Sequence, residues 1–96
     1  MATLLVSHDL HKPVRNYHPL LERLEQFPGR GHCLESTWII PETNHNAGSL
    51  RDELGMLIDQ DDSLMVVDVT RKGWGTKGMS NACNAWLKRN VSMSAS

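Results

Sequence analysis

Apolar and polar residues follow one another along the chain in a pattern that predicts both helices and strands. Two segments, 17–27 and 50–58, place apolar residues at spacings of three and four, the period of an amphipathic helix. A third helix is predicted from a capping Ser80 to about Asn90. Four short segments are predicted to be strands: 3–7, 31–35, 36–40 and 64–70. Pro41, which follows the third of these segments, is expected to end the strand or mark a sheet edge.

This order of elements predicts an α+β, ferredoxin-like fold, βαββαβ with a C-terminal helix. In such a fold two helices cover one face of an antiparallel sheet. The chain has 96 residues, too few for a second core of useful size. We therefore expect a single domain over residues 1–91, with a frayed tail at 92–96.

The first and last strands of the predicted sheet are apolar on both faces. Leu64 and Val66 point to one side of the last strand and Met65 and Val67 to the other, and the first strand has the same character. Two helices shelter only one face, so the second face needs another cover. Either the C-terminal helix folds back over it or a second copy of the chain does. We favour a homodimer joined through sheet faces or edges.

Charge is unevenly distributed although the net charge is only −1. Residues 42–68 carry seven acidic side chains and one arginine, whereas residues 69–96 carry five basic side chains and no acidic one. A basic segment can bind phosphates or an acidic partner. The alternative is a solvated loop followed by a helix whose cations favour its own C-terminus.

Several classes of protein are excluded by composition. No apolar run approaches the ~20 residues that a membrane span needs, and no secretory signal is visible. Cys33 and Cys83 are too few for a disulfide framework or a four-thiolate zinc site. We therefore expect both cysteines to be packed side chains in a reducing, cytoplasmic setting.

Several local strings carry a resemblance that covers nearly the whole chain. They are LLVSHDL at 4–10, HCLESTWII at 32–40, LRDEL at 50–54 followed by IDQDDSLMVV at 58–67, and the ending WLK at 86–88. They resemble the small bacterial and phage proteins labelled "SinR family". No helix-turn-helix of a transcriptional regulator is visible, because strands interrupt the helices. The group is similar in turn to the second CRISPR-associated adaptation protein and to the VapD ribonuclease toxins.

The resemblance implies a metal site and a dimer. In the wider group the first strand ends in an aromatic residue, an Asp and an aliphatic residue. His8, Asp9 and Leu10 match that motif here, with His in place of Tyr. The Asp is proposed to hold a divalent metal, Mg²⁺ or Mn²⁺, near the dimer axis. Ser36 begins the string that stands where relatives carry Ser, an aliphatic residue and Phe. Relatives are homodimers, some reported as metal-dependent nucleases and others acting as a structural DNA-binding part of the spacer-integration complex.

The residue types around Asp9 allow the same chemistry. A carboxylate just past a central strand can bind Mg²⁺, and two copies related by dimer symmetry would make a better site than one. His8 or His11 could act as a general base near neutral pH. Alternatively, Asp9 caps a turn or pairs with Lys12 or Arg15, and the histidines are solvated or hydrogen-bonded.

The expected function is that of a dimeric protein directed at RNA or DNA. Trp74 either stacks on a base or tucks back onto the sheet edge. Phosphate contacts are expected from the residues Lys12, Arg15, Ser36, Arg71, Lys72 and Lys77. The protein is then a metal-dependent endonuclease, or a non-catalytic protein-interaction or DNA-binding scaffold of a mobile element or defence system.

Overall fold

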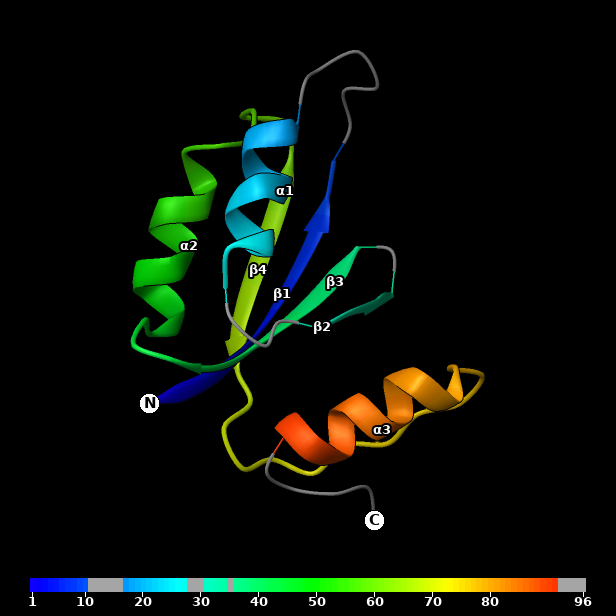
Figure 1. Cartoon of the computed structure of the whole chain (residues 1–96). Helices are drawn as coiled ribbons and strands as arrows, with labels where there is room; N and C mark the ends of the chain where they lie inside the picture. Colours follow the sequence, from blue (N-terminus) through cyan, green and yellow to red (C-terminus); the bar gives the residue numbers. More distant parts are fainter. Residues whose placement is uncertain (11–16, 28–30, 35, 92–96) are drawn as a thin grey trace.

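Four antiparallel strands form one sheet in the order β2-β3-β1-β4 (Figure 1). The computed structural model describes residues 1–10, 17–27, 31–34 and 36–91. The elements are β1 (Ala2–Asp9), α1 (His18–Glu25), β2 (Gly31–Leu34), β3 (Thr37–Thr43), α2 (Ala47–Gly55), β4 (Ser63–Asp68) and α3 (Asn81–Asn90). This topology confirms the α+β, ferredoxin-like prediction. Among the described residues, no helix is both long and apolar enough to cross a membrane.

Helices α1 and α2 lie on one face of the sheet, and the main core is between these layers (Figure 1). Both helical stripes predicted from the sequence are buried there through their leucines. The core residues are Leu4, Val6, Leu20, Leu24, Phe27, Trp38, Ile40, Leu50 and Leu54. Each such side chain contributes about 1.5–3 kcal/mol when it is fully removed from water.

Local signals set the ends of these elements. Asn46 caps α2: its side chain accepts from the backbone N–H of Ser49 at 2.8 Å, and the Ser49 hydroxyl accepts from the Asn46 N–H at 3.0 Å. The helix therefore begins at Ala47, earlier than the leucine stripe predicts.

Strand β3 continues past Pro41, because a bulge between Ala2 and Leu4 shifts its pairing with β1. The first alternative, that Pro41 ends the strand, was therefore wrong, because β3 runs to Thr43. The second, that Pro41 marks a sheet edge, stays open, since the described pairing of β3 with β2 runs from Thr37 to Ile39.

The second face of the sheet carries an apolar row that crosses all four strands. Gly31, Ile39, Leu5 and Val67 are successive cross-strand neighbours in this row. Helix α3 packs against the β2 end, where a Cβ on Gly31 would lie 2.4 Å from the ring of Trp86. At the β4 end, Val67 remains 39% exposed. The C-terminal helix thus covers part of the second face, and the β4 side is left open.

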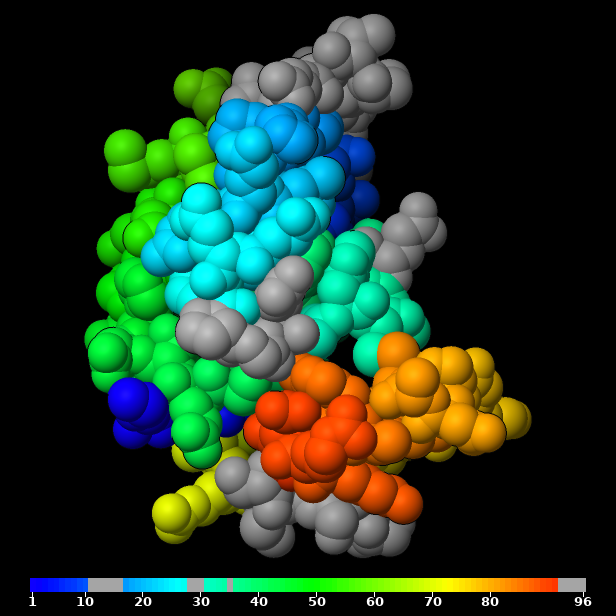
Figure 2. Space-filling model, viewed as in Figure 1, coloured from blue at the N-terminus to red at the C-terminus, as the bar shows by residue number. Residues whose placement is uncertain are grey.

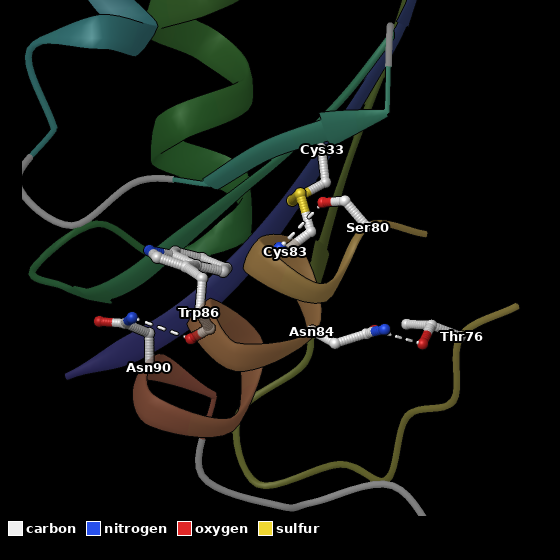
Figure 3. Close-up of a disulfide and its surroundings, with 7 residues drawn as sticks. All are labelled: Cys33, Thr76, Ser80, Cys83, Asn84, Trp86 and Asn90. Atoms are coloured by element: carbon white, nitrogen blue, oxygen red, sulfur yellow. Dashed lines mark hydrogen bonds between the residues drawn. A yellow bond between two sulfur atoms is a disulfide. The ribbon is translucent and has the colours of Figure 1, made fainter. Parts of the chain in front are cut away.

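Cys33 on β2 and Cys83 on α3 form a disulfide, with their Cα atoms 6.0 Å apart (Figure 3). Our prediction of two separate packed cysteines was wrong. Fifty residues separate them in sequence, and only the return of α3 to the edge of the sheet brings them together. Disulfides persist mainly in oxidising compartments. The cytoplasmic setting therefore stays a prediction.

Helix α3 and the segment before it form a lobe at the β2 side of the sheet, away from α1 and α2 (Figure 2). The lobe is fixed to β1 at its start, where the Thr3 N–H donates to Thr70 Oγ1 at 2.9 Å and the Val69 N–H donates to the Thr3 carbonyl at 2.8 Å. Ser80 caps α3 as predicted, accepting from the Cys83 N–H at 3.1 Å.

Candidate functional site

Of the predicted catalytic residues, the structure describes His8 and Asp9, which are neighbours at the end of β1 and point to opposite faces of the sheet. Asp9 is the last residue of this strand; it is exposed and paired with Ser63 on the edge strand β4. The backbone N–H of His8 donates to the Ser36 carbonyl at 3.0 Å, which brings Ser36 beside it. We call His8, Asp9 and Ser36 the strand-end site. The other residues predicted near it, His11, Lys12 and Arg15, lie outside the described residues.

His8 is held in its neutral form. Burial lowers its pKa below the ordinary value of 6.5, the neighbouring His32 lowers the pKa further, and Asp9 partly opposes both effects. Its Nε2 atom is buried and has no hydrogen-bond partner among the described residues. His32 in turn stacks on Trp38, with ring centroids 3.7 Å apart. Nε2 is therefore shielded from a substrate at the surface, and the role of His8 as a general base stays a prediction.

The lowered pKa of His8 predicts a loss of stability in mild acid. The unfolded chain takes up a proton near pH 6.5, whereas the folded chain resists protonation, so stability falls as pH drops below that value. The loss is complete below the folded-state pKa. We expect the melting temperature to fall between pH 7.5 and 5.5, and to fall less in His8→Asn. An NMR titration midpoint for His8 above 6.5 would contradict this account.

The described residues of the strand-end site include one carboxylate, that of Asp9. Mg²⁺ takes six oxygen ligands, often one or two carboxylates with waters and phosphate oxygens. Among the described residues, no group of three His, Cys, Asp or Glu side chains could hold a metal ion. Asp9 is the carboxylate that the sequence predicts as a ligand, and its role in binding Mg²⁺ or Mn²⁺ stays a prediction.

A second group of predicted residues lies in the lobe formed by α3 and the segment before it. We call residues 69–90 the basic lobe. Its five cations are exposed: Arg71, Lys72, Lys77, Lys88 and Arg89. Within the described part of the chain none of them is in an ion pair. Lys88 and Arg89 were not among the predicted contacts, because only the fold places the last turn of α3 beside the loop after β4.

Trp74 lines an apolar groove of about 280 Å³ between the basic lobe and the second face of the sheet. Its neighbours in the groove include Leu5, Ile39, Met79 and Trp86. The indole is half-buried, and its Nε1 atom is buried without a hydrogen-bond partner. This is the placement expected if the indole tucks back onto the sheet. Base stacking by Trp74 stays a prediction.

The strand-end site and the basic lobe lie at opposite ends of β1 (Figure 1). The basic lobe starts beside Thr3, and Asp9 ends the same strand. At about 3.4 Å per residue, the strand between them is roughly 20 Å long. The predicted site residues therefore form two separate groups within one chain rather than a single constellation.

Comparison with protein-family models, with curated proteins and with solved structures finds no match for this chain. The resemblance to SinR-family, CRISPR adaptation and VapD proteins therefore remains a prediction.

Proposed function

We propose that this protein binds nucleic acid as a homodimer and that the basic lobe contacts the phosphates. The observation that carries the proposal is the concentration of five exposed cations there, none in an ion pair with another described residue. Such cations release counterions when they meet a phosphate backbone, which is the main source of non-specific affinity. The lobe presents them from two elements, the loop after β4 and the last turn of α3.

The remaining charge limits where a nucleic acid can bind. The acidic side chains Asp52, Glu53, Asp59, Asp61 and Asp62 belong to α2 and the loop that follows it. Helix α2 covers the face of the sheet opposite to α3 (Figure 1). A polyanion on that face would be repelled. Binding is therefore confined to the side of the molecule that carries the basic lobe.

The triple variant Arg71→Ala, Lys72→Ala, Lys77→Ala is expected to weaken nucleic-acid binding and its salt dependence. If all three residues contact phosphates of duplex DNA, the slope of log K against log salt becomes shallower by about three. Fluorescence anisotropy with labelled DNA and RNA at several salt concentrations measures this. Arg51→Ala, which removes an exposed cation from α2, is the control and should leave the slope unchanged. Equal slopes in the triple variant and the wild type would contradict the proposal.

The dimer is proposed to form over the open, β4 side of the second face. Met65 and Val67 are 58% and 39% exposed there, and β4 is an edge strand of the sheet. An exposed apolar edge is a template for pairing with another chain. A copy that packs on β4 lies close to Asp9, because Asp9 is the β1 partner of Ser63.

Metal-dependent cleavage is a second candidate function, supported by the position of Asp9 next to this proposed interface. Two Asp9 carboxylates across a dimer axis would hold Mg²⁺ or Mn²⁺ better than one carboxylate alone. With RNA or DNA and Mg²⁺ present, we expect cleavage by the wild type and at least a 100-fold lower rate for Asp9→Asn, roughly what removal of a metal ligand or its support costs. Asp52→Asn, an exposed carboxylate on α2, is the control.

The outcome of that assay separates the two roles. Binding without cleavage by the wild type supports a scaffold and removes the nuclease candidate. If Asp9→Asn cleaves as fast as the wild type, the activity belongs to other residues or to a contaminant. Absence of binding at low salt would contradict the nucleic-acid proposal as a whole and leave a protein-interaction module.

A further inference from the structure

Helix α3 is held against the sheet by apolar packing and by one covalent bond that can be broken. The disulfide joins Cys33 on β2 to Cys83 in the first turn of α3. Figure 3 shows Cys83 and Trp86 on successive turns of α3. Trp86 packs on Gly31, and Leu87 is buried. The covalent contact is thus at the start of the helix, and the packing contacts follow along its length.

The segment before α3 has the character of a hinge. It is fixed at one end, where Thr70 accepts from the Thr3 N–H at 2.9 Å. Beyond that point a Cβ added to Gly73 or Gly75 would meet no atom within 4 Å. The main core between the sheet and α1 and α2 contains no residue of α3, and we take Gly73 and Gly75 as the hinge about which α3 moves while that core stays intact.

The disulfide is placed where a thiol can react with it. Both cysteines are half-buried at the edge of the sheet rather than enclosed in the core. Cys83 is the third residue of α3, and its N–H donates to the capping Ser80 hydroxyl at 3.1 Å. A helix N-terminus stabilises a thiolate, which makes Cys83 the better leaving group when the bond is attacked.

We propose that the Cys33–Cys83 disulfide is a redox latch that holds α3 on the sheet. A dithiol reductant attacks Cys33 Sγ, the S–S bond breaks, and Cys83 departs as a thiolate that takes up a proton from water. The second thiol of the reductant then displaces Cys33 from the mixed disulfide. Two electrons pass to the protein, which gains two thiols, and the dithiol becomes a disulfide. Release of α3 exposes Gly31 and the other residues of the apolar row that line the groove, Ile39 and Leu5.

The latch also determines whether part of the basic lobe is fixed in place; this consequence rests on the proposed function. Lys88 and Arg89 are on α3, whereas Arg71 and Lys72 precede the hinge. Reduction therefore separates two cations from the others. The salt dependence of nucleic-acid binding is expected to become shallower by about two when the protein is reduced.

Hydrogen exchange of the full-length protein, oxidised and then reduced with dithiothreitol, tests the latch. Alkylation and mass spectrometry first establish that reduction yields two thiols, at Cys33 and Cys83. We expect the amides of α3 to exchange at least tenfold faster after reduction, while those of β1 and β3 keep their protection. Reoxidation restores protection of α3. The double variant Cys33→Ser, Cys83→Ser should exchange like the reduced protein and not respond to dithiothreitol.

Two results would overturn the latch. If both thiols are free and α3 keeps its protection, packing alone holds the helix. If β1 and β3 lose protection together with α3, the bond is a structural staple of the whole fold. Failure of nucleic-acid binding in both redox states would instead remove the proposed function and leave the exchange result for α3 standing.

Discussion

Replacing both cysteines with serine is expected to lower the free energy of unfolding by about 4 kcal/mol, the chain-entropy value for a cross-link that spans this many residues. The bond joins positions 50 residues apart, so its removal restores much conformational freedom to the unfolded chain. Chemical denaturation followed by tryptophan fluorescence measures the change. This is the largest effect that we expect from any substitution outside the main core.

The matching control is the wild-type protein under full reduction, which should have the same stability as the Cys33→Ser, Cys83→Ser variant. A single variant, Cys83→Ser, tests whether the loss comes from the bond or from the side chains, and should equal the double variant. A loss of stability below about 1 kcal/mol is within the range of ordinary single substitutions. Such a small loss would contradict the presence of this cross-link in the folded protein.

Gly31→Ala is expected to destabilise the protein by about 1–3 kcal/mol, the usual range for overpacking a close contact. The new Cβ would lie 2.4 Å from Cη2 and Cζ3 of Trp86, so the indole must move away from β2. Because Trp86 is central to the packing of α3, that helix should also lose protection. Denaturation gives the stability, and hydrogen exchange shows whether the loss falls on α3.

Gly55→Ala is the matched control for this substitution. Gly55 is the last residue of α2, and a Cβ there would meet no atom within 4 Å. Alanine in a helix is favoured over glycine, so this variant should gain up to about 1 kcal/mol. Opposite signs for the two variants support the contact between Trp86 and Gly31. A neutral Gly31→Ala variant would contradict the placement of α3.

The layer of the fold that carries α1 and α2 could be predicted from periodicity. Leu20 and Leu24 repeat at helical spacing, and the structure buries both against the sheet. The same argument identified Leu50 and Leu54 on α2. These predictions succeed because a helix that buries one stripe against a sheet must carry that stripe in its own sequence.

The position of α3 could not be predicted, because it depends on contacts between distant segments. Gly31 does not indicate in sequence that an indole will pack on it, and two cysteines do not reveal whether they pair. The alternative of a helix folding back was recognised, but not that it would cover the β2 end alone. The same limitation applies to the site, because the sequence does not show that Asp9 ends β1 while Lys72 follows β4 near the start of β1.

Helix α3 covers only part of the second face of the sheet. Trp86 and Leu87 of α3 shelter the β2 side, and Met65 and Val67 of β4 are left in contact with solvent. Apolar side chains on an edge strand favour association. A second copy, placed over β4, removes this exposure and brings two strand-end sites near one another.

The molar mass of the oxidised protein in solution tests this claim most directly. Light scattering on a size-exclusion column should give twice the 10.8 kDa of one chain. Met65→Asp should return the mass to a single chain, while Met56→Asp, at a residue 84% exposed on the far side of the sheet, should not. A wild-type mass of one chain at the highest concentration reached would contradict the proposed dimer and the paired Asp9 site that depends on it.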